Sequence, residues 1–117
     1  MNVARSKLLY DGECSFCTCW VEGLKAITKN QVEYLPFQSS HERFPQILIE
    51  DCERSIHWID LKGNVFEGAG AIFRVLACVP GKTWPLRIYE NVPGFASIAE
   101  CAYQIVSKNR KLFGSIC

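Results

Sequence analysis

The stretch that decides the fold is residues 7–17, which read KLLYDGECSFC. A short apolar run ends at Asp11-Gly12, the pattern of a strand followed by a turn. After this turn the spacing of apolar residues becomes helical and stays so to about Asn30. The sequence therefore predicts a strand, a turn and a helix, with Cys14 and Cys17 where the turn meets the helix.

Cys14-Ser15-Phe16-Cys17 is a C-x-x-C motif at the start of this predicted helix. Residues three apart on a helix are neighbours, so a disulfide between the two cysteines is within reach. Backbone N–H groups at a helix N-terminus lower the pKa of a thiol, and a thiolate is the species that attacks a disulfide. The neighbouring Asp11 and Glu13 act in the opposite direction. Each effect is on the order of 0.3–1 kcal/mol, so neither clearly wins.

The two cysteines differ in their expected exposure. Cys14 precedes the apolar stripe of the helix and is expected to be exposed, whereas Cys17 lies within the stripe and is expected to be shielded. This asymmetry predicts an attacking Cys14 and a resolving Cys17, which releases the mixed disulfide.

A metal site is the first alternative, because Cys19 extends the motif to C-x-x-C-x-C. On an ideal helix, however, Cys19 lies about 160° away from Cys17, too far round to bind the same ion. Zinc takes four ligands, and the sequence has no second C-x-x-C and no His pair at ligand spacing. The thiolate metal-binding module stays open as an alternative to an enzyme, and so does a non-catalytic interaction domain with spectator thiols.

The rest of the chain completes one domain of residues 1–117, with a core of about 5–80 and a helical extension of about 84–113. Strands are predicted at 7–10, 32–36, 55–60 and 65–67, and helices at 16–30, 69–79, 84–91 and 95–109. A weaker helix is predicted at 40–48, with Ser40 as its N-cap. The order β-α-β-α-β-β-α, with a right-handed βαβ unit first and a hairpin later, predicts a thioredoxin-like α/β fold.

Composition excludes several classes of protein. With 49% hydrophobic and 21% charged residues the chain is not a disordered one, and a net charge of +1 argues against a nucleic-acid binder. There is no secretory signal pattern, and no apolar run approaches the roughly 18 residues that span a bilayer. We therefore expect a cytoplasmic protein without a membrane partner, in which cysteines stay mostly reduced.

The positions of several other side chains in the sequence predict a role in the site or a place in the core. Pro36-Phe37-Gln38 follows the carboxyl end of a parallel strand, where α/β sheets place their sites, so these residues are predicted to form a substrate-binding wall beside the cysteines. Asp11 is interpreted either as a turn residue or as a carboxylate that holds the loop or relays a proton. The tryptophans and two of the cysteines are predicted to lie in the core: Trp20, Trp58, Trp84, Cys78 and Cys101.

The segment Tyr10–Cys17 resembles the signature of the DCC family of thiol-disulfide oxidoreductases, which is named for an Asp-Cys-Cys motif. Later segments resemble that family in the same order, so the resemblance covers almost the whole chain: 35–39, 63–66, 70–71, 109–110, 113–114 and Cys117. The resemblance implies a thioredoxin-like fold and a protein-disulfide reductase type of activity, with Asp11, Cys14 and Cys17 as the functional positions.

One departure from the wider thioredoxin class concerns the start of the third strand. Those proteins place a cis-proline there, facing the cysteines, whereas this chain has Ser55-Ile56-His57. The departure argues against a thioredoxin-like way of holding an extended peptide.

Taken together, the residues predict an enzyme that exchanges a dithiol for a disulfide through Cys14 and Cys17. It needs no cofactor beyond this pair. Its partners are expected to be a disulfide-containing protein or a small thiol substrate, with electrons from another thiol reductant.

Overall fold

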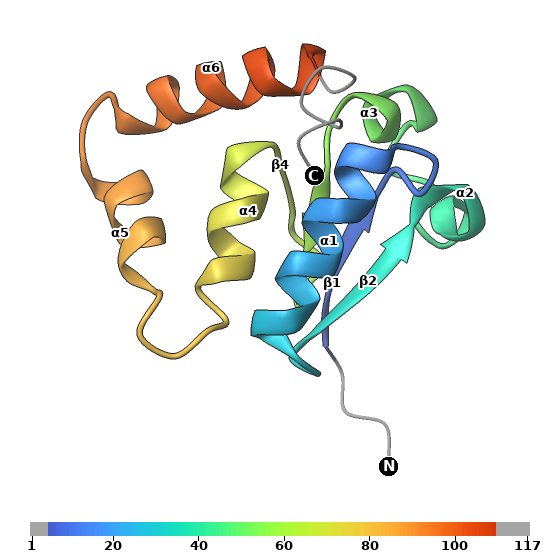
Figure 1. Ribbon diagram of the computed structural model, residues 1–117, viewed down its shortest axis with the longest axis horizontal. Helices are drawn as coiled ribbons and strands as arrows, with labels where there is room; N and C mark the ends of the chain where they lie inside the picture. Colours follow the sequence, from blue (N-terminus) through green and yellow to red (C-terminus); the bar gives the residue numbers. More distant parts are fainter. Residues whose placement is uncertain (1–4, 110–117) are drawn as a thin grey trace.

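The sheet in the computed structural model, which describes residues 5–109, has four strands in the order β2-β1-β3-β4 (Figure 1). The strands are β1 (Ser6–Tyr10), β2 (Val32–Pro36), β3 (His57–Ile59) and β4 (Val65–Glu67). β1 and β2 are parallel, while β3 is antiparallel to both β1 and β4. This mixed sheet and its helices confirm the predicted thioredoxin-like α/β fold.

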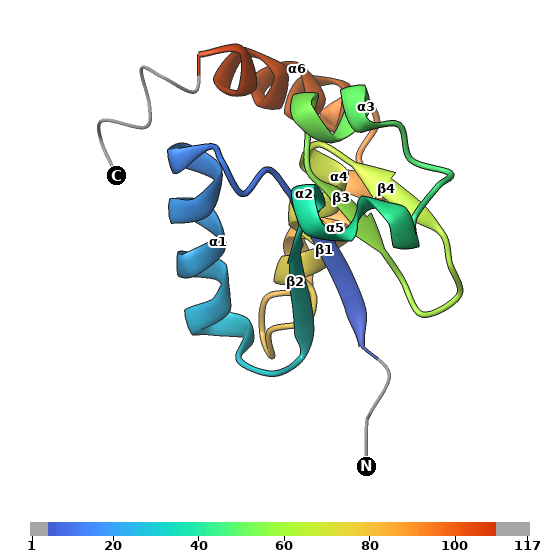
Figure 2. The same cartoon turned by 90° about the vertical axis from the view of Figure 1, so that its right-hand side faces the viewer.

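Helices cover both faces of this sheet (Figures 1 and 2). One face carries α1 (Ser15–Thr28) and α4 (Ala69–Leu76), and the other carries α2 (Phe37–Ser40), the 3-10 helix η1 (His41–Arg43) and α3 (Ile49–Arg54). The alternation of side chains along β1 explains the two layers, because Leu8 packs into the first core and Leu9 into the second. After α4, α5 (Trp84–Asn91) leads into α6 (Phe95–Lys108), which passes across the top of the molecule in Figure 1.

The predicted helix at 40–48 is wrong. Ser40 is the last residue of α2 and the N-cap of the 3-10 helix η1, but its side chain makes no capping hydrogen bond, and no α-helix continues from it to residue 48. Pro45 disfavours helical backbone at the preceding residue and lacks an N–H group, which explains the interruption. Phe44 and Ile47 are instead buried from within the connecting segment, and α3, which was not predicted, follows it.

A carboxylate of α6 caps the start of α4. Glu100 accepts hydrogen bonds from the N–H groups of Ala69 (2.9 Å) and Gly70 (3.2 Å), and from the Tyr89 hydroxyl. Gly68 precedes these residues with a φ of 68°, and a Cβ there would lie 2.5 Å from Glu100 Oε1. The helix has no side-chain cap of its own, so a residue 30 positions away supplies one.

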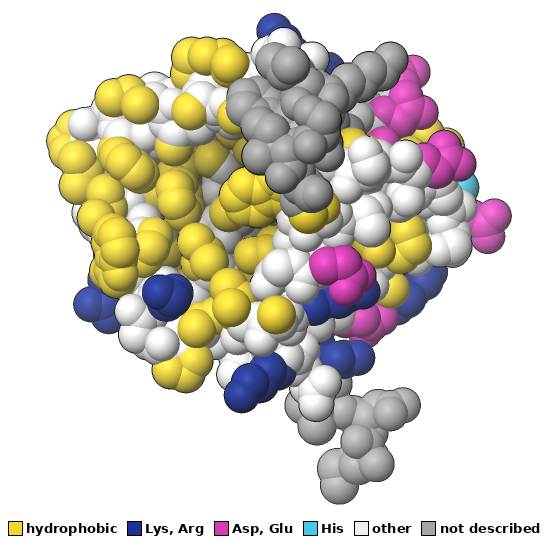
Figure 3. Space-filling model, viewed as in Figure 1, with side chains coloured by type: hydrophobic (Ala, Val, Ile, Leu, Met, Phe, Trp, Pro, Cys, Tyr) yellow, Lys and Arg dark blue, Asp and Glu magenta, His cyan; other side chains and the backbone are white. Residues whose placement is uncertain are grey.

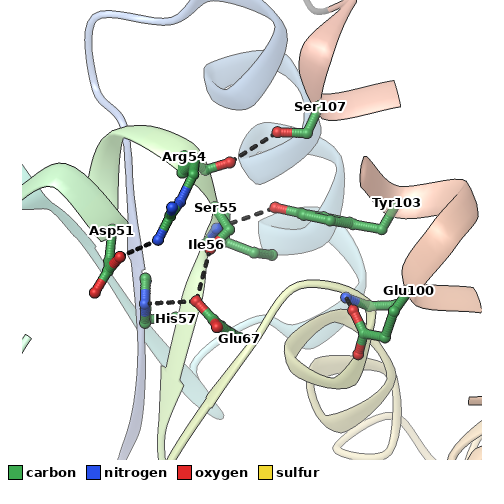
Figure 4. Close-up of polar contacts among 10 residues, drawn as sticks. Asp51, Arg54, Ser55, Ile56, His57, Glu67, Glu100, Tyr103 and Ser107 are labelled. Carbon is green, nitrogen blue, oxygen red and sulfur yellow. Dashed lines mark hydrogen bonds and ion pairs between the residues drawn. The ribbon is translucent and has the colours of Figure 1, made fainter. Parts of the chain in front are cut away.

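The second half of α6 is held against the segment that enters β3 (Figure 4). Ser107 Oγ donates a hydrogen bond to the Arg54 carbonyl at 2.8 Å, and the Ile56 N–H donates to Tyr103 Oη at 3.0 Å. These contacts join residues about 50 positions apart and fix where α6 lies over the sheet.

The predictions for the tryptophans and cysteines are confirmed only in part. Trp58 is buried, but Trp20 is 48% exposed and Trp84 is 60% exposed. Cys101 is also exposed, and Cys78 is half-buried. An apolar residue on an amphipathic helix enters the core only where another element covers that face, which the helical pattern does not specify.

The helical extension was predicted to run to about residue 113, and residues 110–113 lie outside the described range. None of the helices within residues 5–109 is long and apolar enough to cross a bilayer.

Candidate functional site

The C-x-x-C motif lies where β1 leads into α1, and Cys14 is the N-cap of that helix. Cys14 has extended backbone (φ −90°, ψ 117°), and its carbonyl accepts hydrogen bonds from the N–H and the hydroxyl of Thr18, both at 2.9 Å. Its Sγ accepts the N–H of Cys17 at 3.3 Å. The sulfur therefore takes the position that a serine or aspartate oxygen takes in other helices.

The surroundings of the two sulfurs are unequal. Cys14 is half-buried, whereas Cys17 is 9% exposed and lies against the core on the inner side of α1. Both carry reduced thiols. The N–H of Cys17 faces Cys14 Sγ, and the first turn of α1 has no acidic side chain. This is the arrangement in which a helix N-terminus stabilises an anion.

A hydrogen-bonded loop precedes the motif. Asp11 Oδ1 accepts hydrogen bonds from the Glu13 N–H at 3.0 Å and from Gln38 Nε2 at 2.6 Å. Gln38 Oε1 in turn accepts the Gly12 N–H at 2.9 Å. A Cβ on Gly12 would lie 2.8 Å from Pro36 Cβ, so the close approach requires glycine. These bonds tie the Asp11 side chain to the loop, and a role of Asp11 in the exchange reaction stays a prediction.

The structure separates the three residues predicted to form a wall beside the cysteines. Pro36 packs under Gly12, and Gln38 is exposed and bonded to the Asp11 loop. Phe37 is 6% exposed and belongs to the core on the opposite face of the sheet from α1. Contact of these residues with a substrate stays a prediction.

An apolar cavity of about 460 Å³ opens beside Cys17 and was not predicted. Its walls come from α1, α4 and α6, and include Phe16, Trp20, Phe73, Ile98 and Ala102. For the wall formed by α6, the helical spacing of its apolar residues was the one signal in the sequence, and it indicated only that this helix has an apolar face. Nothing in the sequence showed that three segments so far apart would enclose a space.

The other cysteines differ from the pair. Cys52 is buried, and burial together with the nearby Asp51 and Glu53 raises the pKa of its thiol. Burial likewise raises the pKa of the Cys78 thiol. Cys19, the third ligand in the metal hypothesis, is disulfide-bonded. Within residues 5–109, no three His, Cys, Asp or Glu side chains gather as a metal site would require.

Comparison with known proteins gives one family. The family model described as DCC1-like thiol-disulfide oxidoreductase matches residues 8–115. Comparisons with curated proteins and with solved structures give no match.

Proposed function

The chain belongs to the DCC1-like thiol-disulfide oxidoreductase family, and from this premise we propose that Cys14 and Cys17 reduce disulfides by dithiol–disulfide exchange. The family indicates an oxidoreductase. The observation that carries the finer proposal is the position of Cys14 Sγ, which caps α1 and accepts the Cys17 N–H. The two reacting residues are thereby adjacent, with the more exposed one first.

In the first step the Cys14 thiolate attacks one sulfur of a substrate disulfide. A bond forms between Cys14 and that sulfur, the substrate S–S bond breaks, and the other substrate sulfur leaves as a thiolate that takes up a proton. The hydrogen bonds of Asp11 and Gln38 hold the loop before Cys14 during this step.

In the second step Cys17 loses its proton and attacks the sulfur of Cys14. The Cys14–Cys17 disulfide forms, and the second substrate sulfur leaves as a thiol after taking up a proton. The substrate has gained two electrons, and the cysteine pair has lost two. A thiol reductant then restores the pair, so no cofactor takes part. Location in the cytoplasm stays a prediction.

Reduction of insulin disulfides by the full chain, with a dithiol as the reductant, tests this proposal. We expect Cys14→Ser to abolish turnover, and Cys17→Ser to accumulate a mixed disulfide between Cys14 and the substrate, visible by mass spectrometry. Cys101→Ser is the matched control, because Cys101 is exposed on α6, and it should keep wild-type turnover. Wild-type turnover by Cys14→Ser would overturn the proposal, because the reduction would then not use Cys14. Absence of turnover by the wild-type protein would overturn it too and would favour a non-catalytic domain.

A further inference from the structure

The cavity beside Cys17 is the feature that the exchange reaction leaves unexplained. It measures about 460 Å³, and its lining is almost entirely apolar. Pockets that bind small ligands usually measure about 300–1,000 Å³, so this cavity is large enough to enclose a bulky apolar group. Because Cys17 and Phe16 form part of the wall, any occupant lies beside the second cysteine of the motif.

The apolar surface continues outward from the cavity. Trp20 and Ile98 both line it, yet they are 48% and 68% exposed. Figure 3 shows hydrophobic side chains gathered over α4, α5 and α6. Exposed apolar area of this kind marks a binding surface. An occupant therefore fills a concave space and also lies along its rim, which a polypeptide does and a small disulfide does not.

The backbone just before β3 already forms hydrogen bonds within the protein. Ile56, another residue of the cavity wall, donates its N–H to Tyr103 Oη and accepts the Gly68 N–H at 3.2 Å. A polypeptide cannot pair with the backbone at this residue while those bonds persist. Recognition is left to side chains that enter the cavity.

The charged residues around the apolar surface indicate which polypeptides would bind best. The segment 69–109 has two carboxylates, and both are engaged: Glu90 with Arg74 at 3.7 Å, and Glu100 with the start of α4. The other charged residues of this segment are cations, namely Lys82, Arg87 and Lys108. In Figure 3, Lys and Arg lie at the lower edge of the apolar area, whereas Asp and Glu gather at the right of the molecule. The segment 69–109, which supplies two of the cavity's walls, thus carries a net positive charge that complements acidic side chains.

We propose that this cavity is a binding site for large apolar side chains next to the reacting cysteine of a polypeptide disulfide, with acidic residues favoured outside it. The inference rests on the proposed function and names its substrate class. A flat membrane surface covers the rim but leaves the concave space empty, so the cavity favours a polypeptide over a bilayer.

The first test uses the wild-type protein and synthetic peptides that each hold one disulfide. We expect kcat/KM to be about tenfold or more higher when the cysteine is flanked by Phe and Leu than when it is flanked by Ser and Asn. Replacing distal Lys by Glu in the apolar peptide should raise kcat/KM further, and added salt should reduce this gain. Equal rates for the apolar and polar peptides would overturn the inference.

The second test fills the cavity. Ala102→Trp should raise KM for the apolar peptide about tenfold, and by a clearly larger factor than it raises KM for bis(2-hydroxyethyl) disulfide. Ser97→Trp is the matched control, because Ser97 lies on the same helix, is exposed and does not line the cavity. Unchanged KM in a folded Ala102→Trp protein would contradict the inference.

Two outcomes separate the remaining possibilities. If the wild-type protein reduces neither the peptides nor the small disulfide, the proposed function itself fails. If it reduces both peptides equally and sediments with phosphatidylglycerol vesicles, the apolar surface binds membranes, and the inferred substrate class is wrong.

Discussion

The two faces of the sheet begin from neighbouring residues, Leu8 and Leu9, which are 0% and 1% exposed. On the face of Leu9, the short elements α2 and α3 and the segment between them close a complete core, formed by Leu9, Phe37, Phe44, Ile47, Cys52 and Ile59. On the face of Leu8, α1 and α4 pack on the sheet, but a cavity stays open where α6 crosses them.

The difference indicates that the closed face supports the structure on which the open face depends. The closed face fixes β1, and through Gln38, the first-turn neighbour of Phe37, it also fixes the Asp11 loop. The open face carries the cysteine pair and the apolar cavity. A site on rigid elements is held more accurately than one on loops, so dense packing on one side supports reactive groups on the other. The following experiments test this division.

Alkylation rates give the largest expected difference. Cys52 on the closed face is 2% exposed, with a thiol pKa raised by burial and by nearby carboxylates, whereas Cys101 is exposed. Iodoacetamide should label Cys52 about a thousandfold more slowly than Cys101 at neutral pH, because labelling waits for the core to open. Peptide mass mapping over time measures both rates. Comparable rates would show that this face is not closed.

The next largest difference is expected in the free energy of unfolding, when one phenylalanine ring is removed from each face. Phe44→Ala should lower the free energy of unfolding by about 3–5 kcal/mol, since Phe44 is 7% exposed and leaves a void. Phe73→Ala is the matched change in the cavity wall, where the ring is only half-buried, and should cost about half as much. Urea denaturation compares the two variants. A larger loss for Phe73→Ala would reverse the comparison.

The smallest expected effect comes from removing Gln38, whose hydrogen bonds join the closed face to the loop before Cys14. Gln38→Ala removes one hydrogen bond to Asp11 and one from Gly12. At about 1 kcal/mol for each bond, the loss of about 2 kcal/mol of loop ordering predicts a kcat/KM lower by up to about thirtyfold. Gln46→Ala, an exposed glutamine elsewhere, serves as the control. Unchanged kcat/KM in Gln38→Ala would show that the loop is held without it.

Local patterns in the sequence were enough to predict much of the fold. The strand at 32–36 and the helix at 84–91 were predicted with their observed ends, because apolar runs and Pro or Gly boundaries define them. The turn, the C-x-x-C motif and the asymmetry of Cys14 and Cys17 were likewise local.

Long-range contacts were not predictable in this way. The burial of Trp58 but not of Trp20 depends on which elements lie opposite each ring. Glu100 caps α4 from another helix, and the cavity exists only because α6 is held there by Tyr103 and Ser107. A hydrophobic pattern indicates that a face is apolar, but it does not specify what covers that face.

A redox titration of the full chain, with mass-spectrometric assignment of each cysteine, is the most direct test that Cys14 and Cys17 act as a redox pair. We predict that Cys14 and Cys17 lose two hydrogens together and form a disulfide with each other, following a two-electron dependence on potential. Cys52 and Cys78 should stay thiols throughout. A pair that stays reduced at every potential, or that oxidises only to bonds with other cysteines, would contradict the account.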